Sequence, residues 1–410
     1  MVYILFFALI ASINYIIGKK NVLYPAFIYS FLWTVIFSAY IFSPIEVDPI
    51  RHKTAMLLLF GVVAFSAGCY LSRLIRLKNK LRIINTPYQD YGKYFLFIYC
   101  LAVFPWFYRD IAAISGGGLS SLVDLRLAMI NTTLEGQKSY SSVITGSIVM
   151  ISISTTFILF IEKNRFKRLF YLSFLISIVY CILNTSRVSL LILASGLVAI
   201  YLIKSKSSIK FQIALTSLGV PVLIFISAMM AYMFATHLTV DGGALNLANN
   251  YFFIYLIGGI PALDTILKSN TSMVPHHTFQ IFFQLSNSIF GTHFSLPPPL
   301  DAFVQVPFPT NVYTIYKFYF QDFGFVGTLC ALIIIGFIHG AIFRIAKLGN
   351  RYGIYFYAIF MYPLLMSFFD DGYSDFRGLI RNSMVVFICY FIIPKMVKLV
   401  SISKNNYIKI

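Results

Sequence analysis

The chain has 410 residues, of which 59% are hydrophobic and only 11% charged, so it has more apolar surface than a water-soluble domain can bury. Its net charge of +18 does not indicate nucleic-acid binding, because the basic residues lie in short segments between long apolar runs. Apolar runs of about 20 residues are typical of transmembrane helices. We therefore expect residues 1–410 to form a single all-α, polytopic membrane domain.

Eleven apolar segments are the predicted transmembrane helices. In chain order they cover residues 1–17, 22–43, 54–72, 94–112, 143–161, 169–184, 188–203, 211–233, 324–343, 352–369 and 379–397. The segment Tyr251–Leu267 is a candidate for a twelfth span. Gly258, Gly259 and Pro261 interrupt it, and Asp264 lies within it. We favour an amphipathic or re-entrant helix for this segment.

The distribution of basic residues predicts the orientation of the chain in the membrane. One set of loops holds 22 of the 32 basic residues and only two of the 14 acidic residues, Asp90 and Glu162. Cytoplasmic loops carry the excess of lysine and arginine, so this set is predicted to be cytoplasmic. With eleven spans, the N-terminus lies outside and the C-terminus inside.

Two outer loops are predicted to be long. They cover residues 113–142 and residues 234–323, and the second is rich in aromatic residues and poor in charge. That composition does not favour disorder. Long ordered loops in compact proteins usually carry function, so we expect the substrate to be bound there.

A polar and aromatic segment, residues 311–327, follows a proline cluster and leads into the ninth predicted span. Asn311, Tyr313 and Tyr319 are predicted to bind sugar rings, although an interfacial belt of aromatic residues would have a similar composition. Asp322 is a candidate for the base that accepts the proton of a substrate hydroxyl. The alternative is that Asp322 caps the N-terminus of the following helix.

Histidines of the larger outer loop are also candidates for the base, because histidine titrates near neutral pH. We choose His237 as the second catalytic candidate beside Asp322. The same loop contains His276, His277 and His293, and the sequence does not decide among the four.

Four arginines are predicted to bind a diphosphate. Arg187 lies in a short polar turn, and its planar guanidinium can bind phosphate oxygens through two hydrogen bonds, although it could instead anchor a hairpin at the membrane surface. Arg126 follows a glycine-rich run, and its alternative role is an ion pair with Asp124. Arg377 and Arg381 lie one turn apart on one helix face, which suits a diphosphate or a lipid headgroup.

The acidic residues Asp370, Asp371 and Asp375 leave two interpretations open. They could hold a divalent metal ion, or they could pair with Arg377 and Arg381. We favour the pairing, since no further carboxylates with metal-binding spacing join the cluster. The five cysteines all lie in apolar runs and are predicted to be neither disulfides nor metal ligands. We expect no metal and no cofactor.

The order of several motifs resembles a known family of membrane proteins. The motifs are Gly116-Gly117-Gly118 followed by Arg126, then Thr185-Ser186-Arg187, then Gly258-Gly259-Ile260-Pro261-Ala262, and finally Thr310-Asn311-Val312-Tyr313-Thr314 leading to Asp322-Phe323-Gly324 and Gly327. In order and topology the chain is similar to the Wzy-type polymerases of O-antigen or oligosaccharide repeat units. Members of that family often have twelve or more spans, whereas eleven are counted here.

The resemblance implies a glycosyltransferase of the bacterial inner membrane. Such an enzyme joins undecaprenyl-diphosphate-linked repeat units into O-antigen or capsular polysaccharide at the outer face of the membrane. The implied partners are the lipid-linked donor and acceptor, membrane lipids, a chain-length regulator and a flippase. Two rival functions remain at this point: a flippase for the same lipid-linked unit, and a ligase that transfers the finished glycan.

Overall fold

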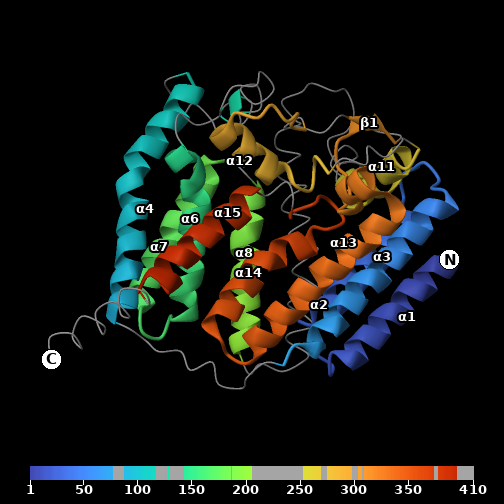
Figure 1. The fold of residues 1–410 in the computed structure, drawn as a ribbon, viewed down its shortest axis with the longest axis horizontal. Coiled ribbons are helices and arrows are strands. Elements are labelled where there is room, and N and C mark those ends of the chain that lie inside the picture. The colour runs from blue at the N-terminus through green and yellow to red at the C-terminus, as the bar shows by residue number, and fades with distance from the viewer. Residues whose placement is uncertain are drawn as a thin grey trace. The chain divides into compact units, whose positions relative to one another are not determined.

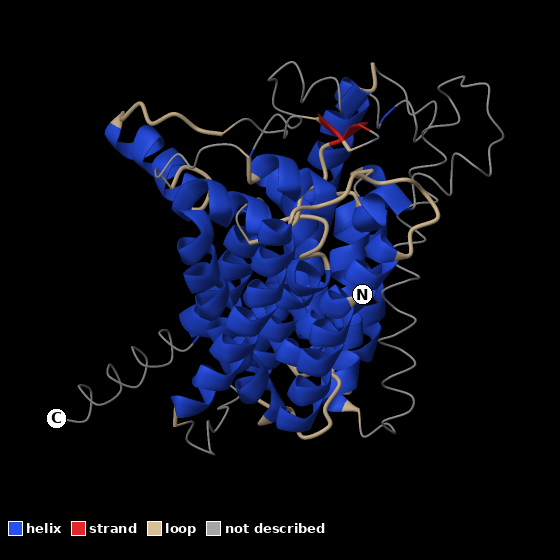
Figure 2. Cartoon of the chain, turned by 90° about the vertical axis from the view of Figure 1, so that its right-hand side faces the viewer, coloured by secondary structure: helices blue, strands red, loops and turns tan. Residues whose placement is uncertain are grey.

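The computed structural model describes residues 1–76, 87–116, 125, 128–129, 143–185, 187–205, 253–268, 275–297, 303–306, 309–373 and 377–394. These residues are mainly helical (Figure 1). Two short strands, β1 (Val304–Gln305) and β2 (Pro309–Thr310), pair antiparallel, with Val304 opposite Thr310 (Figure 2).

The helices follow the apolar runs of the sequence. In chain order they are α1 (Val2–Ile17), α2 (Pro25–Ile41), α3 (His52–Leu71), α4 (Pro87–Ile114), α6 (Val143–Ile161), α7 (Lys167–Leu183), α8 (Arg187–Lys204), α11 (Gly259–Ile266), α12 (Gln280–Phe290), α13 (Tyr316–Lys347), α14 (Arg351–Leu365) and α15 (Arg377–Phe387). A 3-10 turn, Ser72–Leu74, follows α3, and a π-helical turn, Ile388–Ile392, follows α15.

Helices occupy the positions of ten of the eleven predicted spans, and the eighth, residues 211–233, lies outside the described residues. Within the described ranges, three helices are long and apolar enough to cross a membrane: His52–Leu74, Tyr91–Ile114 and Tyr316–Lys347. Several shorter apolar helices accompany them. The chain therefore has the character of a helical membrane protein, whereas the number of spans and their orientation stay predictions.

The helix that contains the ninth predicted span extends beyond that span. The predicted start, residue 324, coincides with a kink in α13 at Gly324, where φ is 67° and ψ is −165°, and a further helical segment from Tyr316 precedes the kink. A positive φ is readily adopted only by glycine, which explains this residue at the kink. The polar and aromatic residues before Gly324 are helical because their side chains are buried in the tertiary structure, which local composition does not reveal.

The segment considered as a twelfth span is helical over its described part. Residues 253–257 and α11 are helical, and Gly258 between them has φ −60° and ψ −25°, with hydrogen bonds that continue the helix on both sides. A helix over residues 253–266 extends about 21 Å, which is less than the roughly 30 Å of a bilayer core. Almost all of α11 is buried within the protein.

The chain divides into two compact units. Unit 1 contains Met1–Leu77, Tyr201–Gly349 and Phe360–Phe376, and unit 2 contains Lys78–Ile200, Asn350–Ile359 and Arg377–Ile410. The helix α14 belongs in part to each of them. The prediction of a single transmembrane domain for residues 1–410 remains a prediction.

Unit 1 is built around the close contact of α3 with α13 (Figure 1). A Cβ atom at Gly68 would lie 2.0 Å from the carbonyl oxygen of Ile333, and one at Gly336 would lie 2.1 Å from that of Phe65. Small residues allow helix backbones to approach in this way, as is common in membrane proteins. Both glycines are therefore required by packing.

Unit 2 contains α4, α6, α7 and α15, and buried hydroxyl groups connect its helices. The hydroxyl of Thr156 on α6 lies 2.8 Å from those of Ser173 and Ser177 on α7. Tyr180 of α7 donates a hydrogen bond of 2.7 Å to the carbonyl oxygen of Cys100 on α4. Such bonds satisfy polar groups that would otherwise be buried without partners.

Candidate functional site

The polar and aromatic segment is held inside unit 1 by backbone and side-chain contacts. The amide of Ile315 donates a hydrogen bond of 2.9 Å to the carbonyl oxygen of Ser367. Tyr313 packs in an apolar cluster with Ala262 of α11 and Val306 beside β1. The ammonium of Lys317 lies 3.8 Å from the centroid of the Tyr313 ring, within the range of a cation–π interaction. The segment is thus part of the core of unit 1.

The three predicted sugar-binding residues differ in exposure. Asn311 is partly exposed, whereas Tyr313 and Tyr319 are each 4% exposed. The hydroxyl of Tyr319 lies 3.4 Å from Oδ1 of the buried Asp371. In this structure both tyrosine rings contact protein, so a sugar could stack on them only after a local movement. Their role in sugar binding stays a prediction.

Asp322 anchors the segment just before α12 to α13. Its side chain is 1% exposed and accepts hydrogen bonds from the Thr278 amide at 2.7 Å, from the Thr278 hydroxyl at 2.6 Å and from the His277 amide at 3.4 Å. The expected alternative was a cap on its own helix, but α13 already begins six residues earlier. Asp322 instead binds backbone groups just before α12. Its role as a base stays a prediction.

The histidines of the loop that is predicted to lie outside, residues 234–323, are only partly described. His237 lies outside the described residues. The ring of His277 lies 4.9 Å from that of Phe318, between centroids, and its amide is one of the donors to Asp322. His276 has a buried Nδ1 with no hydrogen-bond partner among the described residues. The structure thus brings His276 and His277 to the same region as Asp322.

The four predicted diphosphate-binding arginines are described to different extents. Arg126 lies outside the described residues, and only the backbone is described at Arg187 and Arg377, which begin α8 and α15. Arg381 is exposed, and its hydrogen bonds are long: 3.5 Å to Oδ1 of Asn382 and 3.4 Å to the hydroxyl of Ser147. Its guanidinium pairs with no described carboxylate, and its role in diphosphate binding stays a prediction.

Of the acidic residues Asp370, Asp371 and Asp375, the structure describes the first two. Asp371 is 1% exposed and accepts a hydrogen bond of 3.1 Å from the Tyr373 amide. Asp370 accepts one of 2.7 Å from the Asp371 amide, and Asp375 lies outside the described residues. In the described part of the chain, no group of three or more histidine, cysteine or acidic side chains could hold a metal ion.

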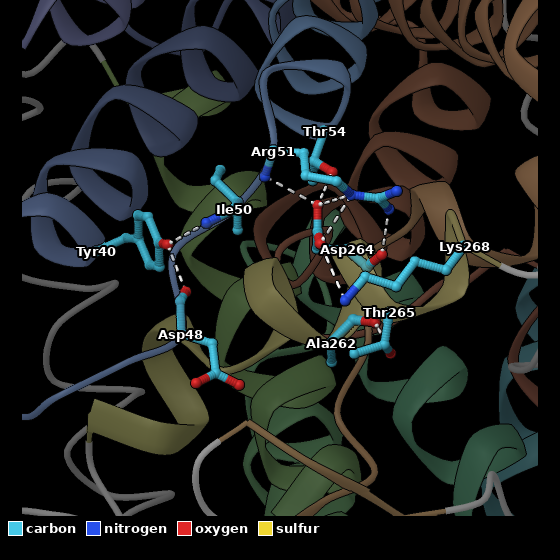
Figure 3. A network of polar contacts seen from close by, with 9 residues as sticks. All are labelled: Tyr40, Asp48, Ile50, Arg51, Thr54, Ala262, Asp264, Thr265 and Lys268. Atoms are coloured by element: carbon cyan, nitrogen blue, oxygen red, sulfur yellow. Dashed lines mark hydrogen bonds and ion pairs between the residues drawn. The ribbon is translucent and has the colours of Figure 1, made fainter.

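An unpredicted network joins α11 to the start of α3 (Figure 3). Both carboxylate oxygens of Asp264 accept hydrogen bonds of 3.2 Å from Nε of Arg51. One of these oxygens, Oδ1, also accepts a hydrogen bond of 3.1 Å from the Arg51 amide and another from the Thr54 hydroxyl. Nη2 of Arg51 reaches the carbonyl oxygen of Asp264 at 2.8 Å, and Nζ of Lys268 lies 4.0 Å from its carboxylate.

The contacts of Asp264 favour its charged form. Burial by itself would raise the pKa of this carboxyl, but hydrogen bonds from Thr54 and Arg51, together with the charge of Arg51, lower the pKa below its usual value. A carboxylate in an otherwise apolar helix was the one available signal, because such a group requires a polar partner. The partner, Arg51, lies 213 residues away and has no local pattern that identifies it.

A second unpredicted network lies in unit 2 and centres on Glu162. Its carboxylate binds the ammonium of Lys93 on α4, and accepts hydrogen bonds from Arg351 at 2.7 Å and from the Tyr390 hydroxyl at 2.9 Å. The side chain of Lys93 is 1% exposed and lies over the ring of Phe166 at 4.0 Å. Lys93, Glu162 and Arg351, which the sequence placed in loops, therefore form a buried structural contact.

Comparison with known proteins identifies relatives that are named O-antigen polymerases. The chain is 25% identical over 373 residues to a putative O-antigen polymerase of Escherichia coli (strain K12), covering 87% of this chain and 88% of that protein. It is 23% identical over 215 residues to an O-antigen polymerase of Shigella dysenteriae, covering 52% of this chain and 53% of that protein. No family model and no solved structure matches the chain.

These matches confirm the resemblance to O-antigen polymerases of the Wzy type. They extend over most of the chain, as the order of the sequence motifs did. Together with the apolar helices, they fit a multi-pass protein of the bacterial inner membrane.

Proposed function

We propose that this chain, a relative of the Wzy-type O-antigen polymerases, joins undecaprenyl-diphosphate-linked repeat units into O-antigen or capsular polysaccharide at the outer face of the inner membrane. The observation that carries the proposal is the similarity to a putative O-antigen polymerase over 87% of the chain. The apolar helices support it, because a lipid-linked substrate has to be met within the bilayer.

The proposed reaction is a glycosyl transfer between two lipid-linked glycans. The acceptor hydroxyl oxygen forms a bond to the anomeric carbon of the donor sugar, and the bond from that carbon to the donor diphosphate breaks. The hydroxyl proton passes to a base, for which Asp322 and His237 are the candidates. The lipid diphosphate leaves with the electron pair, and its charge requires cationic partners.

Arginines supply those partners in the proposed mechanism. Arg126, Arg187, Arg377 and Arg381 are the candidates, and the exposed guanidinium of Arg381 is the best described of them. A diphosphate esterified at both ends carries about two negative charges, so two or three arginines suffice to balance it. The mechanism needs no metal ion.

The central experiment supplies purified protein in proteoliposomes with radiolabelled lipid-linked repeat units. Formation of longer chains is expected. Movement of the lipid between leaflets without chain growth would instead identify a flippase, and glycan transfer that requires a finished acceptor core would identify a ligase.

The same assay tests metal independence. Chain growth should continue unchanged in excess EDTA, because the arginines stabilise the leaving group. If chelation abolished chain growth and magnesium or manganese restored it, the arginine mechanism would be wrong, and the acidic residues Asp370, Asp371 and Asp375 would become the first metal candidates.

Replacement of Arg381 tests the diphosphate contact. Arg381→Ala is expected to slow chain growth by roughly 10²–10³-fold, the usual loss when one charge-stabilising donor is removed. Arg109→Ala is the matched control in unit 2, since its side chain is 70% exposed and its paired Asp110 lies 3.8 Å away. Equal rates for the two variants would remove Arg381 from the mechanism.

A further inference from the structure

The helix α12 carries large apolar side chains that the protein leaves uncovered. Phe282, Ile289 and Phe290 are 63%, 66% and 78% exposed, and Phe279, just before the helix, is 43% exposed. Their spacing places the four side chains on one side of the helix, which we call the apolar face of α12. An exposed apolar surface of this kind is typical of a site that contacts another protein or a membrane.

The length of α12 excludes a membrane span. The helix has 11 residues and ends at Gly291, whose φ of 64° is the left-handed conformation common at helix ends. It therefore extends about 16 Å, whereas a bilayer core is roughly 30 Å thick. A lipid phase can therefore cover this helix only at the membrane surface.

The start of α12 is attached to α13 at the kink. Asp322 binds the backbone just before α12, and the ring of Phe279 lies 6.3 Å from that of Phe323, between centroids. Phe323 immediately precedes the kink at Gly324, and beyond the kink α13 is a candidate membrane span on which Val326 is 72% exposed. The apolar face of α12 thus adjoins the end of a helix surface that is suited to lipid.

The sequence around α12 has the composition of a lipid-facing segment. Residues 269–300 contain no Asp, Glu, Lys or Arg, and their ionisable side chains are His276, His277 and His293. They also contain no Trp or Tyr, whereas Trp, Tyr and Arg dominate the binding energy of protein–protein interfaces. A face made of Phe and Ile in an uncharged segment therefore favours hydrocarbon over a protein partner.

Polar groups near the end of α12 bind one another. Ser286 shares the apolar face by its spacing, and its hydroxyl lies 2.9 Å from that of Thr292. The side chain of Asn287 donates to the carbonyl oxygen of Phe294 and accepts from the Phe294 amide, both at 2.9 Å. Polar groups that are paired within the protein do not require water, so this end of the helix can enter an apolar phase at lower cost.

We propose that α12 is an interfacial helix whose partner is the lipid bilayer, with its apolar face inserted into the membrane surface. Helices of this type lie parallel to the membrane with the apolar face about 5–10 Å into the boundary between headgroups and acyl chains. The inference concerns an interaction surface and does not depend on the proposed polymerase reaction. A second copy of the chain and a different protein are the competing occupants of the face.

The test places a fluorescent nitrobenzoxadiazole label at single cysteines of the full chain, in a form whose five natural cysteines are replaced by alanine. Phe282→Cys and Ile289→Cys report on the apolar face, and Phe290→Cys repeats the test there. Gln284→Cys is the matched control, because Gln284 is exposed on the opposite side of the same helix. The proteins are reconstituted in vesicles of phosphatidylethanolamine and phosphatidylglycerol. Quenching is measured with lipids that carry a nitroxide at a shallow or a deep acyl position, and with iodide in the water.

Quenching by the shallow nitroxide is expected to be about threefold stronger for labels on the apolar face than for the control, and stronger than quenching by the deep nitroxide. Iodide should quench the control more than the face. Equal lipid quenching at face and control would overturn the proposal, as would stronger quenching by the deep nitroxide. Labels on the face that are shielded from both lipid and iodide would overturn it in favour of a protein occupant. If that shielding disappeared at a low ratio of protein to lipid, the occupant would be a second copy.

Discussion

Two carboxylates, Asp264 in unit 1 and Glu162 in unit 2, each connect segments far apart in the sequence. Arg51 and Lys268, the basic partners of Asp264, are 43% and 61% exposed at their side chains. Lys93 and Arg351, the basic partners of Glu162, are 1% and 26% exposed. Both networks satisfy a buried carboxylate, but the basic partners of Asp264 are more exposed than those of Glu162.

The difference in exposure predicts a difference in how strongly each network stabilises the fold. Charges withdrawn from water are costly when a partner is lost, so the Glu162 network is expected to contribute strongly to stability. Ion pairs between exposed groups contribute less, because water can solvate the cations when the pair is lost. The Asp264 network is therefore expected to contribute less than the Glu162 network.

Cysteines allow the two networks to be tested separately. Cys100 is 2% exposed and lies on α4 with Lys93, so its reaction with a thiol reagent reports opening of unit 2. Ala262 of α11 is fully buried, and a cysteine introduced there reports opening near Asp264. Each reporter would be the only cysteine in its variant, with the remaining cysteines replaced by alanine.

The largest effect is expected for Glu162→Ala. It leaves the charges of Lys93 and Arg351 without this carboxylate, which should lower the free energy of opening in unit 2 by about 3–5 kcal/mol. Labelling of Cys100 in detergent measures the change. Glu46→Ala removes an exposed carboxylate and is the control. If both variants labelled at the wild-type rate, the Glu162 network would have no structural role.

A smaller effect is expected for Asp264→Ala. Its basic partners are 43% and 61% exposed and can be solvated by water, whereas the buried hydroxyl of Thr54 loses its acceptor. The loss should therefore be about 1–3 kcal/mol, near the cost of leaving a polar group unsatisfied. Labelling at Ala262→Cys should accelerate while Cys100 labelling stays unchanged. Faster labelling at both positions would show that the two networks are not independent.

Acidification should weaken the Asp264 network. The pKa of Asp264 is lowered in the folded protein, so its contribution is complete above the unfolded value of about 4 and disappears as pH falls through the folded value. Labelling at Ala262→Cys with a pyridyl disulfide, which reacts in acid, should accelerate below about pH 4. Asp264→Asn should remove this additional dependence. An identical pH profile for the asparagine variant would exclude Asp264 as the responsible group.

Local composition was sufficient to place most helices and to indicate the family. Long apolar runs predict helices because a backbone in a bilayer has to satisfy its own hydrogen bonds, and helices were found at ten of the eleven predicted positions, with the eighth segment outside the described residues. The order of short motifs led to O-antigen polymerases, and two relatives agree with it. The ninth predicted span starts at the kink of α13 at Gly324, and the helical residues 316–323 before the kink were not predicted from local composition.

Only the tertiary structure decided which polar groups meet. The sequence offered Asp322 as a base or a cap of its own helix, and the fold made it the anchor of Thr278, 44 residues away. It also buried Tyr313 and Tyr319, paired Asp264 with Arg51, and placed Lys93 against Glu162. Hydrophobic periodicity is encoded over a few neighbouring residues, whereas a partner for a buried charge is selected by the packing of helices that are distant in the sequence.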